Sequence, residues 1–483
     1  MKKSVESLFD RPVNRRAFAR RAAMGGAALG GLGWATEGDL EAAMQAVNQM
    51  SRPSELEITD LRIAHVKDAP MRCPLVKLYT NQGIVGLGEV RDGADPRYAL
   101  MLKPRLLGLN PCDVDLVFRR IKQFGGHARQ AGGVCGVEMA LWDIAGKAYD
   151  VPAYQLLGGK FRDRVRCYAD TTISRDPEVF ADRLAKRKEE KGFTFLKMDM
   201  GTRLFPEDSA KYLTQPVGRS SWERSRVMHM FTGEELTPAG VDYLVEYAGV
   251  VRERIGWDTP LAADHFGHIG LNSCIRLGKA LEKYNLAWLE DMVPWEHMDI
   301  MKQITEAVDI PVLTGEDIYL KEKFMEMVDN HVVDIVHPDL ASSGGLLETK
   351  KIGDYAQEGG VAMAMHFAGT PVSFMANVHC AAATENFLAL EHHSVDVPWW
   401  EDMVRVTGSG LPLFENGYAP VQDGPGLGVE LVDEVVQEHL YEPGYFEPTP
   451  EWDKAPSNDR LWSLNPSPAP RRIKPGLQRL LDA

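Results

Sequence analysis

The stretch LAADHFGHIGLNSCIRLGKALEKYNLAWLEDMVPWEHMDIMKQITEAVDIPVLTGE, residues 261–316, decides the predicted fold. It contains three short apolar runs, and each run ends in an acidic residue: Asp264, Glu290 or Glu316. Longer stretches between the runs carry apolar residues at helical spacing. This alternation is typical of repeated βα units, whose strands form a parallel sheet.

The same period continues toward the C-terminus, where Asp339, His366 and Glu391 follow further apolar runs. Consecutive members of the series from Asp264 to Glu391 lie 23 to 27 residues apart, about one βα unit. In a (β/α) barrel the carboxyl ends of all strands open at one mouth, where the active site lies. We therefore predict an α/β protein in which residues 161–400 form a modified (β/α) TIM-type barrel, with six ionisable side chains at its mouth.

Residues 57–160 predict an N-terminal α+β capping domain. Residues 57–65 and 74–80 alternate apolar and polar side chains, as half-buried strands do, and residues 84–90 continue the pattern after a tight turn. Residues 136–149 carry apolar side chains at helical spacing.

The other segments are assigned from their position and composition. The run that ends in Lys197-Met198-Asp199 lies 65 residues before Asp264, which is too far for one βα unit and indicates an insertion over the barrel mouth. The remaining boundaries are an export signal over 1–35, a linker over 36–56, an insertion at about 200–236, a C-terminal return to the capping domain over 401–440, and a Pro-rich extended tail over 441–483.

The N-terminus resembles a twin-arginine export signal. Arg15 and Arg16 are paired, Phe18 follows two residues later, and a weakly apolar Ala/Gly stretch runs from Ala22 to Ala35. That stretch is shorter than the roughly 20 apolar residues of a membrane span. We predict export to the periplasm and a mature form outside the membrane; the alternative is a flexible basic tail.

The composition restricts the partners. The chain has 54 Lys and Arg against 69 Asp and Glu, a net charge of −15, which argues against nucleic acid as a partner. The six cysteines form no CxxC pair, so we expect buried small hydrophobic residues rather than a zinc or iron–sulfur site.

Asp264, Glu290 and Glu316 would form an all-oxygen cluster at the mouth. Bare carboxylates at close range repel each other, and a hard divalent cation removes that repulsion. Oxygen ligands with room for water and substrate suit Mg²⁺, so we predict one Mg²⁺ per subunit. Such an ion can bind a substrate carboxylate and stabilise the enediolate that forms when the α-proton leaves. The alternative is a set of isolated surface acids.

His366 and Asp339 form a predicted catalytic pair. A carboxylate that holds one imidazole nitrogen leaves the other nitrogen positioned as a proton acceptor. Glu391 faces the same opening, and in its protonated form it could donate a hydrogen bond to the substrate carboxylate.

These motifs together resemble the mandelate racemase branch of the enolase superfamily. The resemblance rests on the strand-end series and on the stretch ALWDIAGKA at 140–148 with QLLGG at 155–159, and it covers roughly residues 57–440. It implies capping-domain loops near 67–73 and 90–95 that close over the substrate. It also implies Mg²⁺ on the three carboxylates, with the His366–Asp339 dyad as the base.

The sequence departs from the family pattern on the second barrel strand. Many relatives carry Lys-x-Lys there, whereas this chain has Lys197 and Asp199, so the second lysine base is missing. Racemisation needs proton delivery from the opposite face and is disfavoured. We expect Lys197 to contact the substrate. We expect the acid that helps the β-hydroxyl leave to be His366 itself, His265 or His268.

We therefore predict a dehydratase that converts a sugar acid, its small-molecule partner, to a 2-keto-3-deoxy acid. One alternative is an epimerase or cycloisomerase that uses the same enolate, with Asp199 or His268 as its second acid–base group. Another is an exported, non-catalytic sugar-acid-binding protein. We expect a homo-oligomer, as is usual for relatives.

Overall fold

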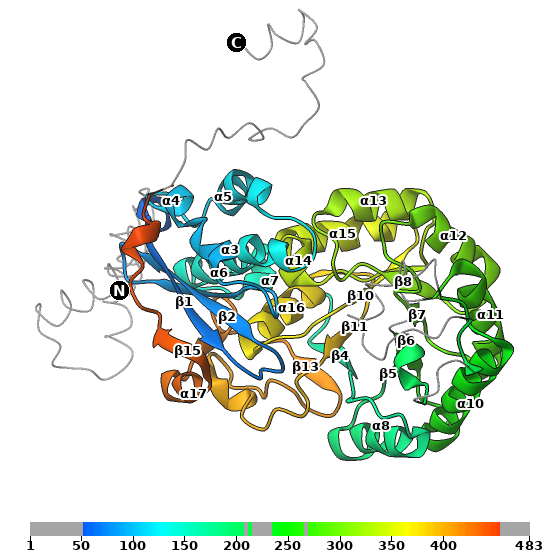
Figure 1. Ribbon diagram of the computed structural model, residues 1–483. Helices are drawn as coiled ribbons and strands as arrows, with labels where there is room; N and C mark the ends of the chain where they lie inside the picture. The colour runs from blue at the N-terminus through cyan, green and yellow to red at the C-terminus, as the bar shows by residue number, and fades with distance from the viewer. Residues whose placement is uncertain (1–51, 207–210, 215–233, 265–268, 455–483) are drawn as a thin grey trace, which may run out of the picture. The chain divides into compact units, whose positions relative to one another are not determined.

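The computed structural model describes residues 52–206, 211–214, 234–264 and 269–454 (Figure 1). Contacts divide the chain into Met1–Arg52 and Pro53–Ala483, and the description below concerns the second unit. The predicted export signal, His265 and His268 lie outside the described residues, as do parts of the predicted insertion and tail.

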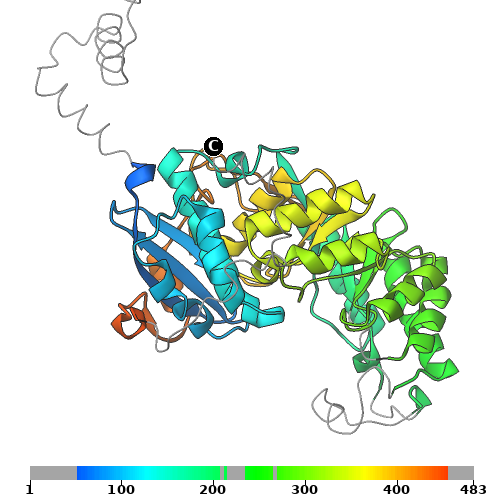
Figure 2. The same cartoon turned by 90° about the horizontal axis from the view of Figure 1, so that it is seen from above.

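The N-terminal part is an antiparallel sheet with the strand order β15-β1-β2-β3. One long helix, α6 (Gly132–Tyr149), packs against it (Figure 2). The approach is close because Gly86 and Gly88 of β3 have no Cβ, which would collide with backbone carbonyls of α6. The elements are β1 (Ile58–Val66), β2 (Cys73–Thr80), β3 (Val85–Glu89), α3 (Arg97–Leu100), α4 (Lys103–Leu106), α5 (Val114–Ile121), α7 (Ala153–Leu156) and β15 (Leu440–Tyr445).

The second part is a closed barrel of parallel strands, which confirms the predicted fold class. The strands follow in chain order from β4 to β11, and β11 also pairs with β4, with Leu390 opposite Cys167. The strands are β4 (Arg164–Ala169), β5 (Leu196–Asp199), β6 (Leu261–Asp264), β7 (Leu289–Glu290), β8 (Val312–Thr314), β9 (Ile335–Val336), β10 (Ala362–Met365) and β11 (Phe387–His392).

Helices follow the barrel strands, as the repeated βα pattern predicts (Figure 1). They are α8 (Pro177–Lys191), α10 (Pro238–Ile255), α11 (Leu271–Leu281), α12 (Met298–Ala307), α13 (Lys321–Asp329), α14 (Leu340–Ser343), α15 (Leu346–Glu358) and α16 (Pro371–Ala383). A separate buried cluster consists of one side chain from each barrel strand or its edge, and we assign it to the barrel interior: Tyr168, Phe195, Ala262, Trp288, Leu313, Ile335, Ala364 and Ala389.

Two buried glutamates join the capping sheet and helix to the barrel helices. Glu138 of α6 accepts hydrogen bonds from the backbone N–H of Leu346 (2.7 Å) and Leu347 (3.1 Å), in the first turn of α15. Glu89 accepts from the backbone N–H and the hydroxyl of Thr370, at the start of α16. A carboxylate at a helix N-terminus satisfies N–H groups that have no partner within the helix. These contacts fix the capping domain over the barrel.

The chain returns to the capping domain after the barrel. The segment contains β12 (Val404–Val406), β13 (Tyr418–Pro420), β14 (Val429–Leu431) and α17 (Asp433–Glu438). The first residues of the predicted tail form β15, which pairs with β1. This part of the predicted tail therefore belongs to a sheet. Further along, the buried Lys103 forms an ion pair with Asp453 (2.7 Å).

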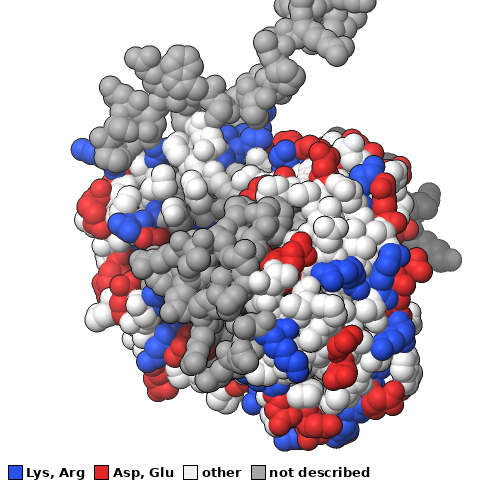
Figure 3. Space-filling view, turned by 45° about the vertical axis from the view of Figure 1, so that its right-hand side comes forward, with Lys and Arg blue, Asp and Glu red and all other residues white. Residues whose placement is uncertain are grey.

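The surface and the cysteines agree with the composition. Acidic and basic side chains are interspersed over the face seen in Figure 3. All six cysteines are unpaired, and five of them are buried. Within the part of the chain that the structure describes, no helix combines the length and apolar character needed to cross a membrane.

Candidate active site

Lys197 is the centre of one buried charge cluster at the barrel mouth. Its Nζ lies 2.6 Å from Oε1 of Glu391, 2.8 Å from Oδ2 of Asp264 and 3.7 Å from Oε1 of Glu290. Burial alone would lower the pKa of Lys197, but these carboxylates raise it well above its ordinary value. The three predicted site residues around Lys197 thus favour its charged form.

The predicted dyad lies across from this cluster. Nδ1 of His366 is 2.6 Å from Oδ2 of Asp339, and its Nε2 is 3.3 Å from Oε2 of Glu316 and 3.8 Å from Oε2 of Glu391. Burial would lower the pKa of His366, but Glu316 and Glu391 raise it to about 9. Because Asp339 holds Nδ1, the nitrogen left facing Glu316 and Glu391 is Nε2.

Arg91 reaches the same dyad from the capping domain. It follows β3, is 1 % exposed and forms an ion pair with Asp339. Its Nη1 lies 3.3 Å from Nδ1 of His366, and its Nη2 lies 3.4 Å from Oε1 of Glu316. Glu316 is thus held on the dyad side of the mouth.

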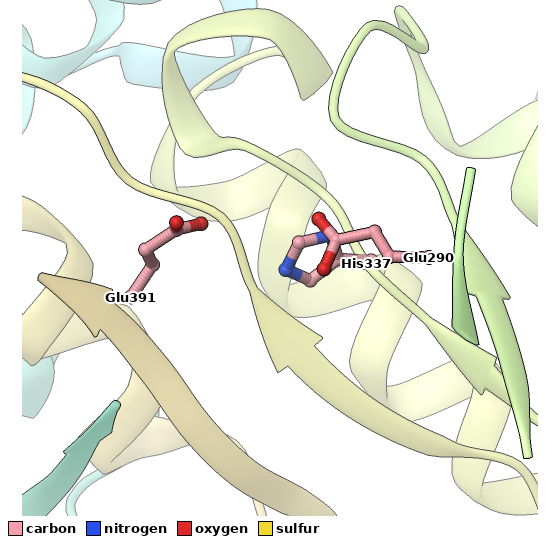
Figure 4. Close-up of side chains that lie close together, drawn as sticks. All are labelled: Glu290, His337 and Glu391. Carbon is pink, nitrogen blue, oxygen red and sulfur yellow. The ribbon is translucent and has the colours of Figure 1, made fainter. Parts of the chain in front are cut away.

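The three predicted Mg²⁺ ligands are divided between these two groups. Asp264 and Glu290 face Lys197, whereas Glu316 contacts His366 and Arg91. Among the described residues, the group whose ligand atoms lie within 4.8 Å of one another is instead Glu290, His337 and Glu391 (Figure 4). The Asp264–Glu290–Glu316 triad therefore stays a prediction.

The electrostatics of the mouth nevertheless fit a divalent cation. Burial first, and Asp264 next, raise the pKa of Glu290 well above its ordinary value. Burial, with Glu316 and Asp264 as neighbours, does the same to the pKa of Asp291. The negative charge of these clustered carboxylates is therefore not fully balanced by neighbouring cations. A site with several carboxylate oxygens suits Mg²⁺.

Similarity to known proteins agrees with this geometry. Residues 179–435 match the family model for the enolase C-terminal domain-like fold, and residues 41–158 match that for the mandelate racemase / muconate lactonizing enzyme N-terminal domain. The chain belongs to the mandelate racemase / muconate lactonizing enzyme family.

Several proteins similar to this chain are named as sugar acid dehydratases. A D-xylonate dehydratase of Haloferax volcanii is 36 % identical over 80 % of this chain and 90 % of its own length. An arabinonate dehydratase of Saccharolobus solfataricus is 26 % identical over 78 % of this chain and 93 % of its own. The crystal structure of a mandelate racemase/muconate lactonizing enzyme-like protein from Rubrobacter xylanophilus is 31 % identical, covers 80 % of this chain and 98 % of its own, and has a TM-score of 0.70. The chain is an enzyme of this family, and hydro-lyase is the class that these relatives support.

The candidate active site of this family member includes a buried network that the sequence analysis missed. The Tyr168 hydroxyl lies 2.8 Å from Nε2 of His337 and 3.1 Å from Oε2 of Glu391, and Nδ1 of His337 lies 3.2 Å from Oε1 of Glu290. A signal was present, since His337 lies two residues before Asp339 on the same extended run. Trp288 also donates a hydrogen bond of 3.1 Å to Oε2 of Glu290.

Two aspartates at the mouth have partners of their own. Asp199 ends β5 opposite Asp264 and forms an ion pair with Arg203, in the short 3-10 helix Thr202–Leu204 that follows. Asp291 has a φ of 49°, an uncommon value for a residue other than glycine, and its Oδ1 accepts a 2.5 Å hydrogen bond from Thr314. Backbone strain beside Glu290 is typical of functional sites.

Proposed function

We propose that this enzyme is a Mg²⁺-dependent dehydratase that converts a sugar acid to a 2-keto-3-deoxy acid. The observation that carries the proposal is the position of His366. Its Nδ1 is held by Asp339 while its Nε2 faces the carboxylates of Glu316 and Glu391, with buried Lys197 on the other side of Glu391. One histidine base without a second lysine suits elimination better than racemisation.

The chain's own residues supply the proton transfers. In the metal-free protein, Glu316 and Glu391 outweigh burial and hold the pKa of His366 at about 9. With a cation bound at Glu316, that carboxylate charge would be offset and this pKa lowered, so that the neutral imidazole can accept, at Nε2, the proton from the carbon next to the substrate carboxylate; Asp339 stabilises the imidazolium that results. Glu391 and Lys197 lie where they can interact with the substrate carboxylate, on which negative charge grows. Mg²⁺ held by Asp264, Glu290 and Glu316 would supply Lewis-acid stabilisation of that charge.

Elimination completes the reaction. The electron pair of the broken C–H bond forms the C2–C3 double bond, and the β-hydroxyl leaves with a proton as water. The imidazolium of His366 can donate its proton to the leaving hydroxyl. The remaining enol tautomerises to the 2-keto-3-deoxy acid, so the products are that acid and one water.

The first prediction is product formation from a panel of sugar acids. Purified enzyme with Mg²⁺ should convert at least one five- or six-carbon aldonate to a 2-keto acid, which a semicarbazide assay detects. Product NMR should show a methylene at C3, because water has been lost. Absence of 2-keto acid formation from every sugar acid in the panel would contradict the proposal.

The same NMR experiment separates the epimerase or cycloisomerase alternative. Either reaction conserves the formula of the substrate and creates no 3-deoxy carbon. An epimerase also needs a second acid–base group, and Asp199, one candidate, is paired with Arg203. A non-catalytic binding protein is disfavoured because binding needs no buried base such as the His366–Asp339 pair.

We also propose that the protein is exported by the twin-arginine pathway, on the basis of Arg15, Arg16 and Phe18. The second prediction is that residues 1–56 direct a folded reporter to the periplasm and that changing both arginines to lysine keeps it in the cytoplasm. Cell fractionation measures this. Unchanged export of the lysine variant would argue against the pathway.

A further inference from the structure

Arg91 is a buried cation that the capping domain contributes to the barrel mouth. A guanidinium that is removed from water requires partners for its charge and its N–H groups. Its Nε lies 2.8 Å from Oδ1 of Asp92, and its Nη2 lies 3.7 Å from Oδ1 of Asp317. Its other contacts are with barrel residues that have a role in the proposed mechanism: Asp339, His366 and Glu316.

Three residues of the proposed mechanism contact this one side chain. Nη1 forms an ion pair with Asp339 and lies 3.3 Å from Nδ1 of His366. Glu316 receives hydrogen bonds of 3.4 Å at its backbone carbonyl and at Oε1. Arg91 therefore spans the base, the carboxylate that orients the base, and a proposed Mg²⁺ ligand.

The contact also fixes both oxygens of Asp339. Oδ1 accepts a 2.6 Å hydrogen bond from the backbone N–H of Ala341, at the start of α14. Oδ2 is shared between Arg91 and Nδ1 of His366. Without the guanidinium, the contact of Oδ2 with Nδ1 of His366 would remain, and the pair would lose this contact with the capping domain.

We propose that Arg91 is a positioning residue for the His366–Asp339 dyad and for Glu316. The side chain belongs to the capping domain and its targets belong to the barrel, so the base is correctly placed only when the loop after β3 is docked. This inference rests on the proposed function, in which His366 is the base.

Arg129 provides a matched control. It also comes from the capping domain and lies beside the same acids, at 3.2 Å from Oδ2 of Asp92 and 3.3 Å from Oδ1 of Asp317. In the part of the chain that the structure describes, it makes no hydrogen bond or ion pair with His366 or Asp339. A general loss of capping-domain contacts should affect both arginine variants alike.

The third prediction compares Arg91→Met with Arg129→Met in the full-length, Mg²⁺-loaded enzyme. Misplacement of a catalytic group by about 1 Å can cost about 100-fold in rate, so kcat of Arg91→Met should fall about 100-fold or more. KM should change by less than about 3-fold, because Arg91 positions the base rather than the substrate. Arg129→Met should keep kcat within about 3-fold of the unaltered enzyme.

Two further measurements keep the inference testable apart from turnover. Crystal structures should show His366 and Asp339 displaced in Arg91→Met and in contact in Arg129→Met. Mn²⁺ titration followed by electron paramagnetic resonance should show weaker binding in Arg91→Met alone, since Glu316 loses its partner. Arg91→Lys, which keeps the charge and is the variant to use if the methionine variant does not fold, should recover part of the kcat because one ammonium can still pair with Asp339.

The outcomes separate the two proposals. Equal kcat in Arg91→Met and Arg129→Met, or an undisplaced dyad in Arg91→Met, would overturn the role of Arg91. Failure of the unaltered enzyme to act on any sugar acid would instead contradict the proposed function, and the crystal structures would still decide whether Arg91 positions the dyad.

Discussion

Replacing His366 with asparagine should reduce turnover by about 10²–10⁴-fold, the usual contribution of a general base. Asparagine is close in size and keeps an N–H that can pair with Oδ2 of Asp339, so the local structure should survive. It has no nitrogen that accepts a proton at neutral pH. The α-proton of the substrate would then have no acceptor.

Exchange of the substrate α-proton with deuterium from D₂O, followed by NMR, measures this step directly. The exchange should stop in His366→Asn. His331→Asn is a suitable control, because His331 is exposed and its φ of 51° is well tolerated by asparagine. Exchange that persists in His366→Asn would exclude His366 as the base.

The barrel and most of its mouth could be predicted because they depend on a period in the sequence. Strands of one parallel sheet end at one mouth, so residues at strand ends converge whatever the loops do. The period therefore predicts that Asp264, Asp339 and His366 reach one mouth, and the structure places His366 beside Asp339. The contact of Lys197 with Asp264 was not predicted. Their chemical roles remain predictions.

Contacts between distant segments could not be predicted from that period. Arg91 meets His366 across 275 positions of the chain, and no spacing rule indicates such a pair. That the capping loop at 90–95 closes over the substrate stays a prediction, whereas the contact of its arginine with the dyad was not predicted. His337 and Tyr168 were missed because each, taken alone, is an ordinary buried polar residue on a strand or beside one.

Helix α6 begins four residues earlier than the predicted segment 136–149. We expected a helix over 136–149 because apolar side chains recur there at helical spacing, and the low helix propensity of Gly132 and Gly133 gives no signal for an earlier start. The helix begins at Gly132, and a Cβ on Gly133 would collide with the backbone of Tyr98. Tertiary packing therefore requires glycine where propensity opposes it.

Replacing Glu290 with glutamine should abolish Mg²⁺ binding while it stabilises the metal-free protein. Asp264 and Glu316 would remain, but the loss of one charged ligand from three should weaken binding beyond detection at millimolar Mg²⁺. The unaltered enzyme should gain about 2.7 kcal/mol at 100 times Kd, whereas the variant should gain nothing. Thermal unfolding with and without Mg²⁺, together with Mn²⁺ titration, measures both effects. Glu296→Gln, at an exposed position, is the control.

The pH dependence of metal-free stability separates this explanation from a general packing effect. The pKa of Glu290 is raised well above 4.5 in the folded protein, so above about pH 4.5 the folded state binds more protons at this site than the unfolded state. This group therefore makes stability fall as pH rises, until the folded pKa is passed. Glutamine does not titrate, so the advantage of Glu290→Gln should widen as the pH rises from about 4.5 toward the raised pKa of the folded protein. A constant difference across that range would show that the carboxylate charge is not what opposes folding, and the case for a cation at this mouth would lose its physical basis.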